Sequence, residues 1–142
     1  MSNPTPSLAV EGEALKEAYA ALNRNDISAT VEVFDQQIEW TEPPDFPGAG
    51  TRNGLAAIKA HLAKAREGWA EGSCEPERLL VAGDKIIVFL HVHVRLKHEN
   101  EWRDGSVTDV HTFRDGKVIQ VRTFGEKEQA LEWAGVKASA AS

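Results

Sequence analysis

The sequence of 142 residues contains one cysteine, no apolar run long enough to cross a membrane and no cluster of lysine or arginine. Cys74 alone cannot form a disulfide within the chain, and the first segment, MSNPTPSLAV, has neither the basic start nor the apolar run of a secretory signal. These absences predict a cytoplasmic protein in a reducing compartment, and they argue against a membrane protein.

Positive charge is also scarce. Sixteen basic residues stand against 22 acidic ones, which gives a net charge of −6 at pH 7. Phosphate backbones and anionic lipids attract clustered positive charge, so we expect no nucleic-acid partner and no membrane partner. A glycine loop that could cradle phosphate is missing too, because PGAGTRNG (47–54) is a connection interrupted by proline.

The composition is that of an ordinary globular protein, with 42% apolar and 27% charged residues. A chain of this length can bury a core without disulfides or a structural metal. We therefore expect a single domain over residues 1–142, with an ordered core at about residues 8–136.

Apolar periodicity separates the chain into a helical first half and a strand-rich second half. It predicts helices at 8–24, 26–34, 55–70 and 126–136, and strands at 38–42, 78–83, 85–97, 106–113 and 117–124. Asp26 and Asn53 are the expected N-caps, Gly135 the stop of the last helix, 43–50 a loop and 137–142 a frayed tail. Short hairpin connections between the late strands predict an antiparallel meander. The fold class is α+β, with the N-terminal helices packed in the concave face of a strongly curved antiparallel sheet.

Five segments carry a family resemblance: AALNRND (20–26), IEWTEPP (38–44), GTRNGLAAIKAHL (50–62), FRDGKV (113–118) and ALEWAGV (130–136). In this order and spacing the chain resembles the nuclear transport factor 2-like (NTF2-like) superfamily, in its SnoaL-like polyketide cyclase and ketosteroid isomerase-like branch. The resemblance implies a cone-shaped, cystatin-like fold with a pocket for a small apolar molecule. Known members include isomerases, cyclases and dehydratases that use no cofactor, and also non-catalytic binders, so the fold leaves the chemistry open.

Glu42 ends the first predicted strand, where the resemblance to ketosteroid isomerases places the carboxylate that acts as general base. A carboxylate that faces an apolar cavity is desolvated, which raises its pKa and makes it a better base near neutral pH. Alternatively, Glu42 lies on a solvated rim, as most glutamates do.

Asp109 is the second candidate acid. Counting back from the turn at 114–116 puts Asp109, His111 and Phe113 on one face of their strand. If the hairpin has one residue fewer than in the isomerases, the resemblance matches Asp109 to the protonated aspartic acid of their oxyanion hole. If the sequences are matched without this one-residue gap, Val110 takes that place. Alternatively, Asp109 pairs with an arginine across the sheet. His111 beside a carboxylate is similar to the residue types of scytalone dehydratases.

The aromatic candidates for substrate binding are Tyr19, Trp40 and Phe113. The oxyanion tyrosine of the isomerases aligns with Ala18, so Tyr19 is rotated by about 100° around its helix, and steroid isomerisation is not favoured. Tyr19 reaches the cavity edge or packs in the core. Trp40, two residues before Glu42 on the same face, would wall the cavity or pack in the core.

His91 and His93 share one face of the strand FLHVHVR (89–95) and are further substrate-binding candidates. Ungapped matching to the isomerases turns them inward, whereas the alternation alone puts the aliphatic face, with Val92 and Val94, on the helices. The outward face is apolar in both cases, which predicts a homodimer through the outer sheet.

His91, His93, His111 and Glu42 would be a plausible set of metal ligands. The resemblance implies cofactor-free chemistry, and we expect neither metal nor cofactor. The sequence thus favours a cofactor-free isomerase or lyase of cyclase or dehydratase type. Its catalytic candidates are Glu42, Asp109 and His111, and its substrate would be an apolar carbonyl compound. The alternatives are a non-catalytic binding or accessory protein of the same fold and a dimerisation module whose cavity is filled by side chains.

Overall fold

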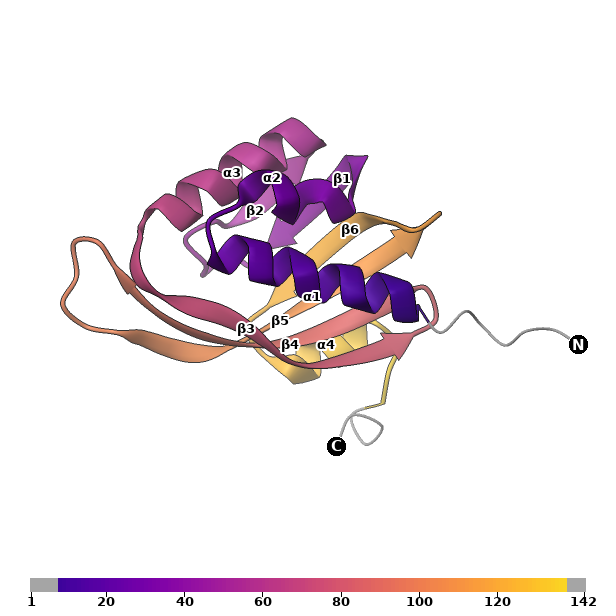
Figure 1. Cartoon of the computed structure of the whole chain (residues 1–142). Helices are drawn as coiled ribbons and strands as arrows, with labels where there is room; N and C mark the ends of the chain where they lie inside the picture. The colour runs from indigo at the N-terminus through magenta and orange to yellow at the C-terminus, as the bar shows by residue number, and fades with distance from the viewer. Residues whose placement is uncertain (1–7, 138–142) are drawn as a thin grey trace, which may run out of the picture.

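The computed structural model describes residues 8–137. It consists of one mixed, curled six-stranded sheet with helices on both faces (Figure 1). The helices are α1 (Ala9–Asn23), α2 (Ile27–Thr30), the 3₁₀ turn η1 (Val31–Val33), α3 (Leu55–Glu67) and α4 (Lys127–Trp133). The strands are β1 (Phe34–Glu42), β2 (Gly50–Asn53), β3 (Trp69–Ala82), β4 (Lys85–Leu96), β5 (Arg103–Arg114) and β6 (Lys117–Phe124).

The sheet has the strand order β2-β1-β6-β5-β4-β3. The last four strands form the expected antiparallel meander. The β1–β6 pair is parallel, so the sheet is mixed rather than purely antiparallel. This pairing places the end of β1 beside the end of β6, and it brings the first half of the chain onto the sheet.

The inner face of the sheet packs against α1, α2 and α3. Its core contains fully buried residues from α1, β1 and β4, including Leu15, Ile38, Ile86 and Val88. Each element contributes the face that its apolar alternation predicts. A smaller core on the outer face lies under α4 and consists of Ile87, Val110, Phe124, Ala130 and Leu131.

The aliphatic face of β4 is therefore the inner one. Val88, Leu90 and Val92 belong to the inner core, whereas Ile87 and Phe89 pack on the α4 side. The ungapped matching that turned His91 and His93 inward is wrong, and the alternation argument predicted the facing correctly. The physical reason is that burying the all-aliphatic face releases more apolar surface from water than burying two imidazoles would.

Several boundaries differ from the sequence prediction. β3 is much longer than the predicted strand at 78–83, β1 begins at Phe34, and the predicted loop at 43–50 runs into the short strand β2. Asp26 caps its helix by accepting a hydrogen bond from Ala29 N–H, but α3 has Gly54 and not Asn53 at its N-cap, without a side-chain hydrogen bond. Gly135, at φ 78°, follows α4 as expected. The predicted tail falls outside the described residues beyond residue 137.

Within residues 8–137, no helix is both long and apolar enough to cross a lipid bilayer.

Candidate active site

Three polar residues form a row across the inner face of the sheet. Asp109 on β5 pairs in register with Thr123 on β6. On the other side of β6, Thr41 pairs with Arg122, which brings the next residue of β1, Glu42, level with Thr123. Since neighbouring strands lie about 4.8 Å apart, the backbones of Glu42 and Asp109 are separated by about 10 Å. Both candidate acids therefore face the same side of the sheet, with Thr123 between them.

Asp109 is buried, with 5% of its surface exposed, and both of its carboxyl oxygens are hydrogen-bonded. The Tyr19 hydroxyl lies 2.7 Å from Oδ2, and the Thr123 hydroxyl donates to Oδ1 at 2.6 Å. Asp109 does not pair with an arginine across the sheet, which was the alternative expectation. Its partners are neutral hydroxyl groups, which leave the carboxyl able to gain or lose a proton.

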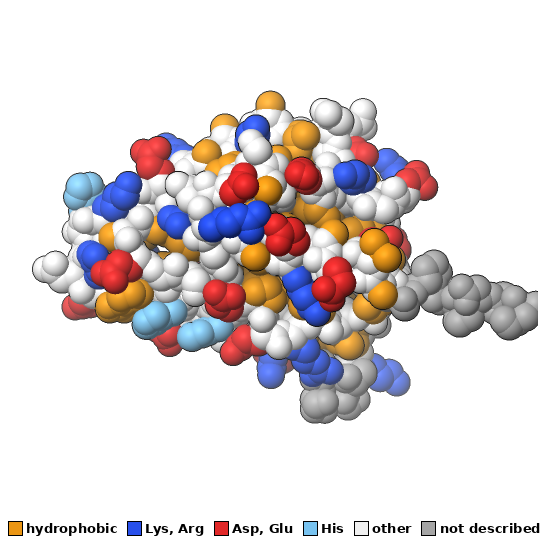
Figure 2. Space-filling model, in the orientation of Figure 1, with side chains coloured by type: hydrophobic (Ala, Val, Ile, Leu, Met, Phe, Trp, Pro, Cys, Tyr) orange, Lys and Arg blue, Asp and Glu red, His pale blue; other side chains and the backbone are white. Residues whose placement is uncertain are grey.

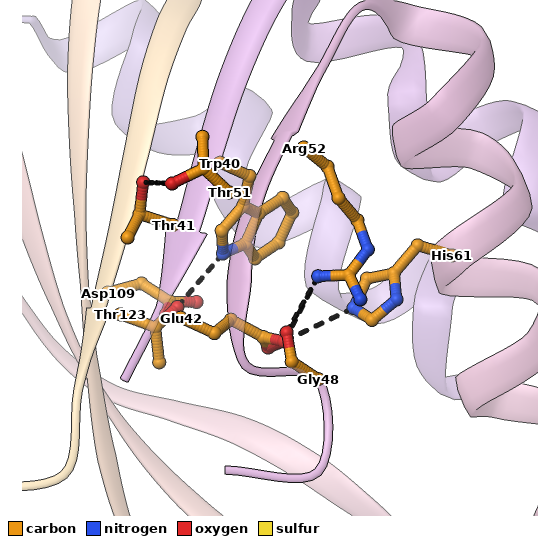
Figure 3. A network of polar contacts seen from close by, with 9 residues as sticks. All are labelled: Trp40, Thr41, Glu42, Gly48, Thr51, Arg52, His61, Asp109 and Thr123. Atoms are coloured by element: carbon orange, nitrogen blue, oxygen red, sulfur yellow. Dashed lines mark hydrogen bonds and ion pairs between the residues drawn. The ribbon is translucent and has the colours of Figure 1, made fainter. Parts of the chain in front are cut away.

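The network extends in two directions from Asp109. On one side, the Tyr19 hydroxyl lies 2.8 Å from Nε2 of His111, which is itself only 2% exposed. On the other, Trp40 Nε1–H donates to the Thr123 hydroxyl at 2.9 Å (Figure 3). Nδ1 of His111 is buried and has no hydrogen-bond partner. The result is a continuous chain from Trp40 to His111 whose last nitrogen is unpaired.

Burial governs the protonation states in this chain. It raises the pKa of Asp109 to about 6, with a smaller contribution from the charge of Glu42, although the hydrogen bonds from Thr123 and Tyr19 act in the opposite direction. Burial lowers the pKa of His111 to about 3, so its imidazole is neutral at pH 7. The pKa of Tyr19 is raised well above its usual value by burial and by the neighbouring Asp109. Asp109 is therefore the group in this chain that titrates near neutral pH.

Glu42 lies in a separate, half-buried cluster at the end of β1. Its Oε1 is 3.2 Å from Nε2 of His61 on α3 and 4.0 Å from the Arg52 guanidinium on β2 (Figure 3). Arg52 also donates to the carbonyl oxygen of Gly48 at 2.6 Å. Burial raises the pKa of Glu42, and Arg52 lowers it by a smaller amount. The alternative of a fully solvated rim position does not hold, because the Glu42 side chain is 18% exposed.

A small cavity lies between the helices and the sheet beside Trp40 and His111, and neither Glu42 nor Asp109 lines it. Its volume is about 20 Å³, enough for one water molecule. The lining is largely apolar and consists of Leu15, Ala18, Tyr19, Leu22, Thr30, Val33, Phe34, Trp40, Leu62 and His111. Drug-sized ligands need roughly 300 Å³ or more, so this cavity is too small for them.

The structure brings together some of the residues predicted from the sequence and separates others. Asp109, His111, Tyr19 and Trp40 belong to one hydrogen-bonded network, and Glu42 lies on the same sheet face without bonding to it. Phe113 is in the inner core but does not line this cavity.

His91 and His93 lie on the outer face, away from the cavity. Each imidazole contacts Oδ1 of Asp104 at 2.9 Å, and Trp102 stacks on His93 at 4.4 Å. Their side chains are 42% and 49% exposed, and Figure 2 shows histidine side chains at the surface. The candidate ligand set of three histidines and Glu42 is thus split between two faces. Within residues 8–137, no three side chains of metal-ligating type gather closely enough to hold an ion.

Four residues of the site were not identified from the sequence: Thr123, His61, Arg52 and Gly48. The first two have a recognisable signal. Thr123 supplies a hydroxyl to Asp109, and its signal is a polar residue two positions after the buried Val121 on the same strand. His61 contacts Glu42, and its signal is a spacing of three residues from Ile58, which puts both on one side of α3. Neither signal identifies the partner side chain.

Residues 15–121 match the model of the SnoaL-like domain. The chain belongs to this family. It is a family of NTF2-like fold that includes polyketide cyclases and isomerases. No curated protein sequence matches the chain significantly.

Solved structures of similar fold cover nearly the whole chain. An NTF2-like protein from Burkholderia xenovorans LB400 is 30% identical, with a TM-score of 0.68 over 87% of this chain and 94% of that one. A putative SnoaL-like polyketide cyclase from Jannaschia sp. CCS1 is 15% identical, with a TM-score of 0.74 over 92% and 95%. TerC, co-crystallized with polyporic acid, is 23% identical, with a TM-score of 0.71 over 88% and 98%. The last two show likeness of fold alone.

The buried carboxyl predicts a specific dependence of stability on pH. Because the pKa of Asp109 is raised to about 6 in the folded state, its protonated form stabilises the fold at low pH, and this contribution is lost as the pH rises through 6. Asp109→Asn should therefore gain stability relative to the parent, by about 2 kcal/mol from about pH 4.5 to about pH 7.5. Urea unfolding at both pH values measures this difference.

Asp45→Asn, in an exposed loop, is the matched control and should follow the parent at both pH values. His111 has the opposite effect on the pH dependence. Because its pKa is lowered in the folded state, the fold loses stability as the pH falls below 6.5, the usual pKa of histidine. His111 is present in both proteins, so to a first approximation its effect cancels in the comparison. A pH-independent difference between Asp109→Asn and the parent would contradict the raised pKa.

Proposed function

We propose that this protein is a cofactor-free isomerase or lyase that acts by proton transfer on a small, apolar carbonyl compound. The observation that supports it is the buried chain Asp109–Tyr19–His111, in which one carboxyl group titrates near neutral pH and the terminal imidazole nitrogen is unpaired. Groups with pKa values near the working pH are the most effective general acids and bases.

The chain has two hydrogen-bonding states that differ in direction. When Asp109 is ionised, Tyr19 donates to its Oδ2, and His111 Nε2–H donates to the Tyr19 oxygen. When Asp109 is protonated, it donates to the Tyr19 oxygen, and Tyr19 donates to Nε2, which leaves the hydrogen of His111 on the unpaired Nδ1. A change at Asp109 is thus transmitted to His111 as a change of tautomer.

Glu42 is the proposed base, and the Asp109 chain the proposed acid. Glu42 would remove a proton from the carbon next to the substrate carbonyl while Asp109, through Tyr19 and His111, supplies a hydrogen bond or a proton to the developing enolate or to a leaving hydroxide. The two carboxyl groups have different surroundings, since one is fully buried and the other half-buried beside Arg52. Such a difference in environment separates the roles of two acids on one scaffold.

The proposed substrate is apolar because the cavity walls are. Leucine, valine, phenylalanine and tryptophan side chains line the cavity beside Tyr19 and His111. At about 20 Å³ the cavity must widen for a substrate to bind, so at least one of the helical segments that line it would move relative to the sheet. TerC, a protein of similar fold, was co-crystallized with polyporic acid, which supports a ligand-binding role for the scaffold.

One observation favours a non-catalytic alternative. The cavity is almost filled by side chains, which is what a dimerisation module without chemistry predicts. Such a protein needs no titrating carboxyl in its core. Substitution of Asp109 and Glu42 distinguishes the catalytic proposal from this alternative.

Substitution of the two acids separates these functions. Compounds from a panel of cyclic ketones and hydroxy-ketones are first tested for binding by ligand-observed NMR, and the binders for turnover. Glu42→Gln and Asp109→Asn should each lower kcat/KM by about 100-fold or more while they leave binding largely intact. Glu39→Gln, on the opposite face of β1, is the control and should match the parent. Turnover at the parental rate in both acid variants would contradict the catalytic proposal and leave the binding alternative.

We also propose that the chain forms a homodimer through the outer sheet. α4 already covers Ile87, Val110 and Phe124, so a partner is not required to cover them. Beside α4, a surface hollow of about 430 Å³ is lined by Phe89 and by polar residues that include Arg78, Thr108 and Lys127. This hollow is the proposed contact.

Sedimentation equilibrium at micromolar concentration should give twice the 15.6 kDa mass of the chain. Phe89→Lys should shift the protein to monomer, whereas Val10→Lys, on an 80% exposed residue of α1, should not. Circular dichroism of both variants verifies that they are folded. A monomeric parent protein would contradict the dimer.

A further inference from the structure

His61 from α3 partly shields the Glu42 carboxylate from solvent. Oε1 of Glu42 and Nε2 of His61 are 3.2 Å apart, and the two side chains are 18% and 19% exposed. The pair therefore joins a strand end to the helix that packs on it. A contact of this length between two titratable groups has room for one shared proton and no intervening water.

The loop after β1 closes over this contact. A Cβ atom at Gly48 would overlap Oε1 of Glu42 and would lie 2.8 Å from Cε1 of His61, so only glycine fits there without displacing the pair. Arg52 holds the loop by donating to the Gly48 carbonyl oxygen. Figure 3 shows Glu42, Gly48, Arg52 and His61 gathered at the end of β1. The loop after β1 therefore encloses the contact between Glu42 and His61.

We infer that His61 is a positioning residue that shares a proton with Glu42 and thereby sets the protonation state of the base in the proposed reaction. This inference rests on the proposed function. The proton that Glu42 takes from substrate carbon passes to Nε2 of His61 when that nitrogen is unprotonated, or returns to the substrate at another atom. No electrons are transferred, and the carboxylate is regenerated.

The local charges support a proton shared between the two groups. Burial raises the pKa of Glu42 and lowers that of His61, so the two values move toward each other. The charged groups that face the pair are Arg52 from β2, which favours the ionised carboxylate and opposes protonated His61, and Asp109 from β5, whose own pKa Glu42 raises. Bringing two pKa values closer together lowers the free-energy cost of proton transfer between the groups.

The pairing itself is tested in the ligand-free protein, independently of turnover. The His61 imidazole is titrated by NMR in the parent, in Glu42→Gln and in Glu39→Gln. Removal of a carboxylate 3.2 Å away should lower the pKa of His61 by about one unit or more, whereas Glu39→Gln should leave it unchanged. An unchanged His61 titration in Glu42→Gln would overturn the inference, even if the protein proves to be an enzyme.

Gly48→Ala provides a second variant that changes no titratable group. It should alter the titration of His61 because the added methyl group displaces the contact. Gly125→Ala is its matched control, since a Cβ there meets only Phe46 at an ordinary 3.5 Å. A parental titration in Gly48→Ala would contradict the enclosed pair.

The role in catalysis is read from the pH profile. His61→Gln keeps a donor near Glu42 but cannot take up a proton, so the acidic limb of kcat/KM against pH should move to higher pH by about one unit. His98→Gln, in an exposed turn, should leave the profile unchanged. A shifted His61 titration combined with parental turnover in both Glu42→Gln and Asp109→Asn would retain the pair and reject the proposed function. An unshifted profile in His61→Gln would reject the positioning role.

Discussion

The burial of one carboxyl group in an apolar sheet face governs the candidate site. Asp109 is 5% exposed and has no cationic partner among the hydrogen bonds and ion pairs of the described residues. Desolvation without a compensating positive charge favours the neutral acid, which is why its pKa rises to about 6. Two hydroxyl groups satisfy its oxygens and keep the ionised form accessible. The site can therefore hold or release a proton near neutral pH.

The surrounding residues follow from this constraint. Tyr19 and Thr123 are each held by a further partner, His111 and Trp40, so that the hydroxyl oxygens keep fixed positions. His111 remains neutral because the same burial that protonates an acid deprotonates a base. On the same sheet face, Glu42 keeps partial access to solvent beside His61. One apolar scaffold thus presents two acids in different electrostatic surroundings.

Strand periodicity predicted part of this site correctly. Counting back from the turn at 114–116 placed Asp109 and His111 on one face, because side chains alternate strictly along a strand. Tyr19 was harder to place, since a helix can rotate about its axis and a long side chain can span the difference of one residue. The contact of Tyr19 with Asp109 depends on how α1 docks on the sheet, which the spacing within α1 does not determine.

Edge strands and contacts between distant segments were not predictable from local pattern. β3 and β2 are the two edges of the sheet, where polar residues and Pro76 are tolerated, so neither shows the apolar alternation of a central strand. The pairing of His61 with Glu42 joins residues 19 positions apart on a helix and a strand. It arises from the packing of α3 on β1, which no spacing within either element encodes.

The most direct test of the central claim is the titration of the Asp109 carboxyl carbon by NMR in the ligand-free protein. A midpoint near pH 6 is expected, and it should rise further in Tyr19→Phe, because the hydrogen bond from Tyr19 lowers the pKa of Asp109. A midpoint near 3.8, the value of an unperturbed aspartate, would contradict the account of a buried acid that titrates near neutral pH.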